Sequence, residues 1–327
     1  MRILVTGGTG AVGKNLEECV RKNWDDFNSV WPDSSWFFVG RGPIVNGKFG
    51  LRSGYRYDLM HKDGAESIIY DHTPDVIVHL AASCGGIGLN SHIPADLARE
   101  NLLQGINIIE AAYSLNVPYV YLAGTTCSFP SETPVPFKEE DLFNGLSEPT
   151  NRAYSDAKKM IFTLHDAYRK QYKLKGAKFI FANLMGRHDN FDLENSHVVP
   201  ALIRKFVEAK RNNSPQVECW GTGEAEREFL NFEDAAYAIY LAVKNRLDTD
   251  LPINIGTGKS IFIKDLAKLI AEIVEYNGLI VFNGKVSDGQ MRRRLDVSRA
   301  KEMFGFEAKI SLEEGLRKTI EWYSDLI

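Results

Sequence analysis

Short apolar runs alternate with longer amphipathic segments over residues 1–182 of the chain. The runs predicted as strands are residues 3–5, 36–39, 76–80, 119–122 and 179–182. The predicted helices are residues 11–22, 94–115 and 152–172, and in the last of these apolar residues recur at helical spacing. Most of the strand runs are apolar throughout, as in a parallel sheet that is covered on both faces. The alternation of strand and helix is typical of βαβ units, so the sequence predicts an α/β fold with a Rossmann-type doubly wound parallel sheet.

The pattern becomes irregular beyond residue 182, where Gly, Asn and Asp are enriched. Further helices are predicted at residues 199–210, 263–276 and 312–327, and residues 254–256 are expected to return to the sheet. We therefore predict two domains. The Rossmann domain takes residues 1–182 plus 229–257, and a smaller, discontinuous C-terminal substrate domain takes residues 183–228 plus 258–327.

Composition and charge narrow the possible functions. The 327 residues include 39 Lys and Arg against 43 Asp and Glu, a net charge of −4. This balance argues against binding of nucleic acid or of an anionic membrane through bulk charge. The four cysteines lie far apart without a Cys-x-x-Cys pair, so neither a disulfide scaffold nor a metal site is expected.

The location of the protein is also predicted from the sequence. The chain opens directly on a strand, with no apolar leader, and we expect a cytoplasmic protein. Residues 111–131 lack charges over a length that could cross a bilayer, but they contain Pro118 and Pro130. We interpret them as a buried strand and its loop, and expect no membrane segment.

A glycine-rich loop follows the first predicted strand. Gly7, Gly10 and Gly13 allow a tight turn, close approach of a pyrophosphate to backbone N–H groups, and close packing of helix on strand. A dinucleotide is expected here, although such loops also occur as plain turns. The second strand runs into Arg41, and an Arg at that place accommodates the 2′-phosphate of NADP, unless Arg41 is only a solvated surface residue. Asp33 precedes the strand, in what we interpret as an inserted loop at residues 25–35.

Tyr154 and Lys158 are four residues apart in a predicted helix, so their side chains lie on one face. A nearby ammonium favours a phenolate, and we expect Lys158 to lower the pKa of Tyr154 toward the neutral range. Thr125 directly follows a strand, at the edge where parallel sheets place ligands. A Tyr and a Lys at this spacing also occur by chance on helix surfaces, and Thr125 is what favours an active site.

These features resemble the extended short-chain dehydrogenase/reductase superfamily, and within it the GDP-L-fucose synthase family of 3,5-epimerase/4-reductases. The motifs that carry the closer resemblance are Cys-Ser-Phe-Pro at 127–130, Gly-Arg-His-Asp-Asn-Phe at 186–191, Trp-Gly-Thr-Gly at 220–223 and Ser-Asp-Gly-Gln at 287–290. The resemblance implies that Thr125 and Tyr154 bind the C4 oxygen of a keto sugar. It also implies that Cys127 is the base and His188 the acid of epimerisation. The alternatives are a buried apolar role for Cys127 and a loop role for His188.

The same resemblance implies the binding residues, an NADP(H) cofactor and a GDP-sugar substrate. Around the cofactor we expect Gly7, Thr9, Gly10, Ala11, Val12, Gly13, Arg41, Asp58, Leu59, Leu80, Ala81, Ala82, Lys158, Asn183 and His188. Around the substrate we expect Thr126, Asn183, Arg204, Trp220, Arg227, Arg292 and Arg293. Guanidinium groups suit the diphosphate because they form bidentate contacts. A homodimer is expected, with the helices at residues 94–115 and 152–172 in its interface.

Three departures from the family pattern leave the identity of the substrate's sugar undecided. Thr125 stands for the commoner serine, residues 181–185 read Phe-Ala-Asn-Leu-Met, and Arg187 replaces a proline. The alternative function is a C4 reductase that acts on a GDP-4-keto heptose or another 4-keto sugar nucleotide without epimerisation. A more remote alternative is a regulator that binds a dinucleotide without catalysis, because a fold alone does not determine function.

Overall fold

The computed structural model describes residues 1–40, 57–284 and 288–327, and all structural statements below concern these ranges. The helices are α1 (Ala11–Lys22), α2 (Trp24–Val30), α3 (Lys62–His72), α4 (Ile87–His92), α5 (Pro94–Ser114), α6 (Arg152–Tyr172), α7 (Val198–Arg211), α8 (Phe232–Lys244), α9 (Ile263–Val274), α10 (Ser298–Phe304) and α11 (Leu312–Leu326), with short 3-10 helices η1 (Thr126–Ser128) and η2 (Glu139–Phe143). The strands are β1 (Arg2–Thr6), β2 (Ser35–Val39), β3 (Val76–His79), β4 (Tyr119–Thr125), β5 (Lys175–Phe181), β6 (Asn183–Met185), β7 (Gln216–Cys219), β8 (Glu226–Asn231), β9 (Pro252–Ile255), β10 (Ser260–Phe262) and β11 (Leu279–Phe282).

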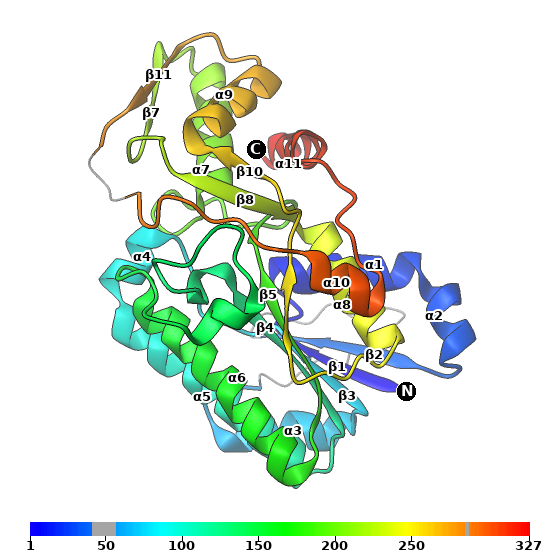
Figure 1. The fold of residues 1–327 in the computed structure, drawn as a ribbon. Helices are drawn as coiled ribbons and strands as arrows, with labels where there is room; N and C mark the ends of the chain where they lie inside the picture. Colours follow the sequence, from blue (N-terminus) through cyan, green and yellow to red (C-terminus); the bar gives the residue numbers. More distant parts are fainter. Residues whose placement is uncertain (41–56, 285–287) are drawn as a thin grey trace.

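The main sheet has six strands in the order β2-β1-β3-β4-β5-β9, and every neighbouring pair is parallel. β1 lies between β2 and β3, so the chain leaves β1 first toward one edge and then returns to pair on the other side (Figure 1). This reversal creates a crevice at the carboxyl ends of β1 and β3, where doubly wound sheets bind ligands. The expected Rossmann-type fold class is confirmed.

Helices cover both faces of the main sheet. α5 and α6 pack together on one face, and α1 and α8 pack together on the other (Figure 1). A Cβ at Gly105 in α5 would lie 2.6 Å from side-chain atoms of Ile161 in α6, so glycine permits the close approach of these two long helices. Residues 3–5 of β1 and 76–78 of β3 are 0–1% exposed as a result, which explains their uninterrupted apolar sequence.

The remaining strands form two small sheets above the carboxyl edge of the main one. β8 pairs with β6 in parallel and with β10 in antiparallel fashion, and β11 pairs with β7. α7, α9 and α11 pack around a second apolar cluster beside these strands (Figure 1). The chain crosses several times between the main sheet and this upper region.

The packing differs in one place from the expected domain boundaries. α10 contacts β9, and Leu295, Phe304 and Phe306 belong to the apolar core of the main sheet. We had placed these residues with the smaller domain. The division into two domains stays a prediction, but residues 295–306 pack against the main sheet of the Rossmann domain.

Several elements follow the sequence pattern closely, and others do not. α1 and α6 have the predicted bounds, whereas residues 25–35, which we interpreted as a loop, contain helix α2. α8 was not predicted. Nine of its 13 residues are buried, and the less buried Glu233, Tyr237, Leu241 and Lys244 recur at helical spacing, so the sequence does carry a helical period that our prediction overlooked.

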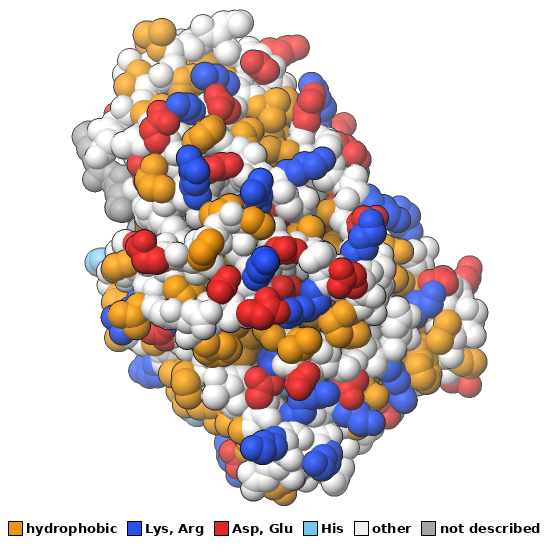
Figure 2. Space-filling model, viewed as in Figure 1, with side chains coloured by type: hydrophobic (Ala, Val, Ile, Leu, Met, Phe, Trp, Pro, Cys, Tyr) orange, Lys and Arg blue, Asp and Glu red, His pale blue; other side chains and the backbone are white. Residues whose placement is uncertain are grey.

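The surface carries charges of both signs without a large area of one sign on the face seen in Figure 2. None of the helices in the described ranges combines the length and the apolar character that a membrane crossing requires. We interpreted residues 111–131 as a buried strand and its loop. They contain the end of α5, strand β4 and the start of the loop beyond it.

Candidate active site

A cavity of about 860 Å³ opens between the carboxyl edge of the main sheet and the upper region. Its lower wall includes Gly10, Thr125 and Tyr154, and its upper wall includes Trp220 and Arg227. It therefore lies at the crevice that the strand order creates, and its volume is in the range of small-molecule and cofactor sites.

The glycine loop forms one end of this cavity. The Gly8 N–H donates to Val39 O at 2.8 Å and the Gly10 N–H to Gly7 O at 3.0 Å, which folds the chain into a compact turn before α1. A Cβ at Gly13 would lie 2.5 Å from Gly8 Cα, so no side chain fits there. Gly10, Ala11 and Val12 at the start of α1 line the cavity, and the start of a helix favours a phosphate.

Most residues expected around a cofactor line this end of the cavity. They are Gly7, Thr9, Gly10, Ala11, Val12, Asp58, Leu59, Leu80, Ala81, Ala82, Lys158, Asn183 and His188. Gly13 is buried behind the loop. Arg41, on which the preference for NADP depended, lies outside the described residues, so its contact with a cofactor stays a prediction.

Thr125, Cys127, Tyr154 and Lys158 meet on the cavity wall although they come from three elements, β4, η1 and α6. Thr125 ends β4, and its Oγ1 accepts a hydrogen bond from the Cys127 N–H at 3.2 Å. The Ser155 hydroxyl of α6 donates to the Cys127 carbonyl oxygen at 2.8 Å. These bonds hold the start of α6 against the end of β4, which places the phenol, the thiol and the threonine hydroxyl around one volume.

The ionisation of Tyr154 differs from the expectation. Lys158 Nζ lies 6.0 Å from the centre of the Tyr154 ring, yet the pKa of Tyr154 is raised well above its ordinary value. Burial is the main cause, and the thiols of Cys84 and Cys127 add to it. Burial also lowers the pKa of Lys158 from 10.5 to about 8. Burial therefore acts against the expected lowering of the Tyr154 pKa.

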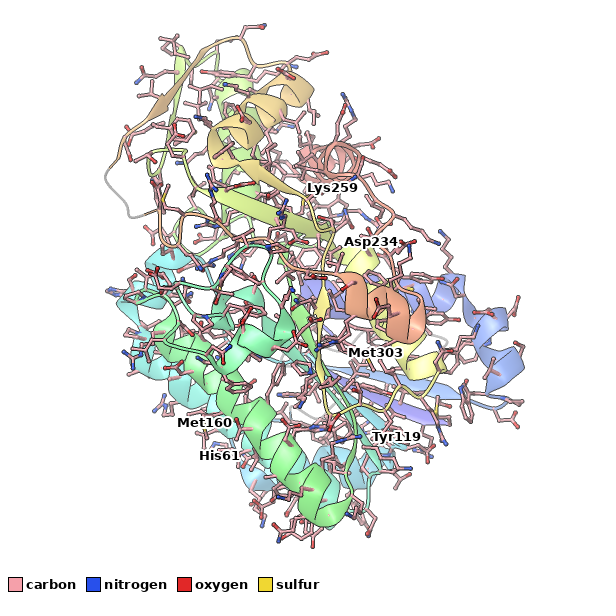
Figure 3. All side chains as sticks on the ribbon, in the orientation of Figure 1. His61, Tyr119, Met160, Asp234, Lys259 and Met303 are labelled. Carbon is pink, nitrogen blue, oxygen red and sulfur yellow. The ribbon has the colours of Figure 1, made fainter. Side chains whose placement is uncertain are left out.

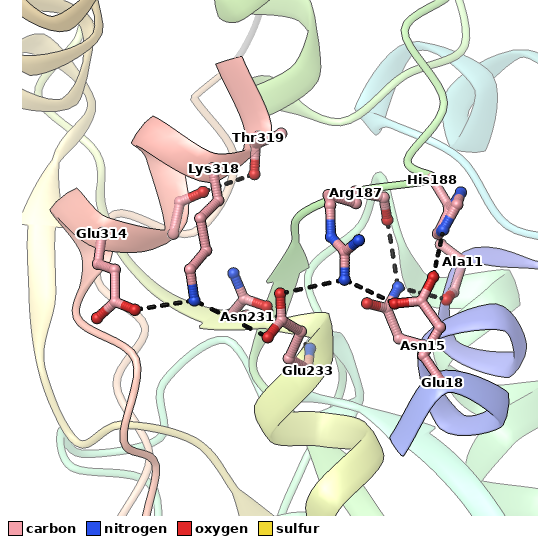
Figure 4. A network of polar contacts seen from close by, with 11 residues as sticks. Ala11, Asn15, Glu18, Arg187, His188, Asn231, Glu233, Glu314, Lys318 and Thr319 are labelled. Carbon is pink, nitrogen blue, oxygen red and sulfur yellow. Dashed lines mark hydrogen bonds and ion pairs between the residues drawn. The ribbon is translucent and has the colours of Figure 1, made fainter. Parts of the chain in front are cut away.

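His188 is held at the cavity edge by the first Rossmann helix. Its Nε2 lies 3.1 Å from Glu18 Oε1, and the other carboxylate oxygen of Glu18 accepts from Arg187 Nη2 at 2.6 Å (Figure 4). Trp322 of α11 packs edge-on against the imidazole, with ring centres 5.2 Å apart. A second carboxylate, Glu233 of α8, lies 3.4 Å from Arg187 and extends the network toward α11.

The basic residues expected at the substrate divide into two groups. Arg227 and Arg293 line the cavity with Trp220, and burial, followed by the charge of Arg293, lowers the pKa of Arg227 to about 10. Arg292 was expected on the ligand side but does not line the cavity, and its side chain is 70% exposed beside Glu226.

Two other expected substrate residues also lie outside the cavity wall. Arg204 pairs with Glu208 at 2.8 Å and donates to Phe191 O. Thr126 is 2% exposed and points into the protein. Their proposed contacts with a substrate therefore have no support from this geometry.

The cavity also contains residues that the sequence analysis missed. Asp189 lines it, and burial raises the pKa of its carboxyl to about 7, while its Oδ2 is buried without a hydrogen bond from the described residues. The signal in the sequence that could have marked Asp189 is its place next to His188. Cys84 lines the cavity as well, and no motif marked it.

Comparison with known proteins places the chain in a family. Residues 3–256 match the NAD dependent epimerase/dehydratase family. The chain belongs to this family and is an enzyme of its epimerase and oxidoreductase type.

Within the family, particular relatives are similar over most of their length. Probable GDP-L-fucose synthase 1 of Oryza sativa subsp. japonica is 37% identical over 84% of this chain and 83% of its own. A GDP-L-fucose synthetase from Naegleria fowleri, solved with NADP bound, is 26% identical with a TM-score of 0.84, over 99% of this chain and 94% of the other. A GDP-6-OMe-4-keto-L-xylo-heptose reductase from C. jejuni is 26% identical with a TM-score of 0.85, over 100% and 98%. The resemblance inferred from the motifs is confirmed.

Proposed function

We propose that this enzyme epimerises a GDP-linked 4-keto-6-deoxy sugar at C3 and C5 and then reduces it at C4 with NADPH. The observation that carries the proposal is that Thr125, Cys127, Tyr154 and His188 line one cavity. Reduction alone needs only a group that protonates the C4 oxygen. Epimerisation needs in addition a base and an acid, and the thiol and the imidazole supply them.

NADP(H) is the cofactor in this proposal. The residues fit a dinucleotide because the loop leaves no room for a Cβ at Gly13, and because the start of α1 lines the cavity, where a helix terminus favours a phosphate. When bound, NADPH supplies the hydride that reduces C4. Lys158 holds the ribose next to the nicotinamide, and the lysine is protonated below about pH 8.

The protein groups act on the C4 carbonyl in two stages. Neutral Tyr154 and Thr125 donate hydrogen bonds to the C4 oxygen, which stabilises the enolate formed when Cys127 removes the proton from C3 or C5. His188 then protonates the carbon from the opposite face. In the reduction the phenol gives its proton to the C4 oxygen and regains one from solvent. A phenol with a raised pKa is in the protonated form that both stages require.

The second candidate is C4 reduction without epimerisation. It is favoured by the similarity to the C. jejuni protein, which is named a reductase of a 4-keto heptose. The two functions differ in one measurable property, because only epimerisation exchanges the C3 and C5 protons with solvent.

The test is incubation with GDP-4-keto-6-deoxymannose and NADPH in D₂O, followed by NMR of the sugar. We expect deuterium at C3 and C5, together with NADPH oxidation. Tyr154→Phe is expected to lower NADPH oxidation by about 10²- to 10⁴-fold while NADPH still binds, because a proton donor is lost. Cys127→Ser is expected to lower deuterium entry sharply. NADPH oxidation without deuterium entry in the unaltered enzyme would instead establish the simple reductase.

We also propose that the protein forms a homodimer through α5 and α6. The two helices carry exposed apolar side chains, with Ile106, Tyr113 and Met160 being 38%, 44% and 55% exposed. Figure 3 shows Met160 on the outer side of α6. Light scattering after gel filtration tests the dimer, and a monomeric mass would refute it.

A cytoplasmic location of the protein also stays a prediction.

A further inference from the structure

Arg293 is a buried cation that faces a thiol instead of a carboxylate. Arg293 is 5% exposed, and its Nη1 lies 3.0 Å from Cys127 Sγ. Its Nε donates to the amide oxygen of Gln290 at 3.1 Å. Within the described ranges, no carboxylate oxygen lies within 4.0 Å of this guanidinium. A buried charge needs a compensating partner, and the sulfur is the ionisable atom in contact with it.

The direction of this hydrogen bond follows from the chemistry of the two groups. A guanidinium has N–H donors and no acceptor, so Nη1 must donate and the sulfur must accept. A sulfur that carries negative charge accepts more strongly than a neutral thiol, because the donor is a cation. The contact therefore fixes where the sulfur points, and it holds a cation beside the atom that would remove a proton from carbon.

The contact is held on both sides by the backbone. The Arg293 N–H donates to Glu226 O at 3.1 Å, which ties the segment to β8. The Gln290 amide donates to Ser131 O at 2.9 Å, and Ser131 follows Cys127 in the same loop. The guanidinium and the sulfur are thus fixed to each other by bonds that do not depend on a ligand.

Other titratable groups act on the sulfur from the surrounding elements. Arg227 of β8 is a second cation, and Tyr154 of α6 and Cys84 are neutral. The buried carboxylate of Glu148 interacts with Arg293 and Arg227 from a distance beyond direct contact. The Arg227 guanidinium donates to the carbonyl oxygens of Glu226 and Asp288. Arg227 therefore leaves the direct contact with Cys127 to Arg293.

We propose that Arg293 is the positioning residue for the base Cys127, whose sulfur it orients and beside which it holds a positive charge. The catalytic meaning of this contact rests on the proposed function, because it takes Cys127 as the base. The contact itself makes a prediction about thiol reactivity that needs no substrate. It also changes the role first expected for Arg293, which was to bind only the diphosphate.

The first test measures alkylation of each cysteine by iodoacetamide at pH 7 in the full chain, with peptide mapping by mass spectrometry. Iodoacetamide is neutral, so the arginines do not attract it. We expect Arg293→Gln to slow alkylation of Cys127 by about tenfold, since the sulfur loses the cation beside it. Alkylation of Cys84, in the same cavity, should change less than twofold. The matched control is Arg292→Gln, which removes the neighbouring, exposed guanidinium and should leave both rates unchanged.

The Arg293→Gln variant could lose its fold, so Arg293→Lys is measured as well. Lysine keeps the positive charge and replaces the guanidinium with a single ammonium donor. It should restore Cys127 alkylation to between the rates of the glutamine variant and the unaltered protein. An unchanged Cys127 rate in Arg293→Gln overturns the proposal, and so does an equal loss at Cys84, which would indicate a collapsed cavity.

A second test uses GDP-4-keto-6-deoxymannose and separates positioning from substrate binding. If Arg293 positions the base, Arg293→Gln lowers the rate of deuterium entry at saturating substrate. If it only binds phosphate, KM rises and the saturated exchange rate stays unchanged, which overturns the proposal. Should the enzyme reject this sugar altogether, the proposed function fails while the alkylation result still decides the contact.

Discussion

At the residue scale, burial rather than a neighbouring charge sets the protonation of the central pair. Tyr154 and Lys158 are close enough to interact, but each is driven toward its neutral form by loss of water. A neutral phenol suits proton donation to the C4 oxygen. The lysine is charged at neutral pH only at a cost to the stability of the fold, because its pKa is lowered to about 8.

Lys158→Met should therefore stabilise the protein while it removes activity. A lysine whose pKa falls from 10.5 to about 8 on folding destabilises the fold fully below pH 8, and this penalty disappears as the pH rises toward 10.5. We expect the variant to gain about 2 to 3 kcal/mol in unfolding free energy at pH 7, and less at pH 10. Denaturant unfolding at both pH values measures it. Lys159→Met is the control, since Lys159 pairs with Asp156 and should give no gain.

At the scale of elements, the start of α1 combines a turn, a packing contact and a binding surface. Gly7 has a φ of +73°, which side chains rarely adopt, and Gly13 faces the backbone of the loop. The same helix carries Glu18 one and a half turns later, where it holds His188 (Figure 4). α1 therefore positions both the dinucleotide loop and the proposed acid.

Gly13→Ala tests the packing at this helix. The added Cβ would lie 2.5 Å from Gly8 Cα and 2.6 Å from Gly7 O, so the loop must move. We expect a loss of about 1 to 3 kcal/mol in stability, together with weaker NADPH binding, measured by thermal unfolding and by titration. Gly10→Ala is the milder comparison, since its Cβ meets nothing closer than Gly7 O at 3.3 Å. Equal stability of the two variants would contradict the argument.

At the scale of the whole molecule, a buried carboxylate joins the two sheets on either side of the cavity. Glu228 of β8 is 1% exposed and accepts hydrogen bonds from the N–H groups of Gly258 and Leu295, at 2.8 and 2.6 Å. Gly258 lies between β9 of the main sheet and β10 of the upper one. Through Glu228 the upper wall of the cavity is tied to the lower.

Glu228→Gln should weaken this junction. The amide keeps one acceptor oxygen but turns its NH₂ group toward backbone donors, which leaves buried groups unpaired. We expect a loss of about 2 to 3 kcal/mol in unfolding free energy, measured in guanidinium chloride. Glu224→Gln removes an exposed carboxylate that pairs with Lys264 and should change stability by less than about 0.5 kcal/mol. Similar losses in the two variants would refute the role of Glu228.

Features that depend on neighbouring residues in the chain were predictable from the sequence. The period of apolar residues predicted α1 and α6 with their bounds, and the glycine spacing marked the loop that opens the cavity. Thr125 was a candidate because it directly follows a predicted strand, and parallel sheets bind their ligands at the carboxyl ends of the strands. These signals are local, since helical period, turn geometry and strand order are set within a few residues or within one βαβ unit.

Features that depend on burial and on distant contacts were decided only by the tertiary structure. Arg293 contacts Cys127 across 166 positions, while the adjacent Arg292 points to solvent, and no local pattern distinguishes the two. The pKa of Tyr154 rises because of the protein that surrounds it. Desolvation and long-range contact exist only once the chain is folded, so the sequence determined which groups are present and the fold decided what each of them faces.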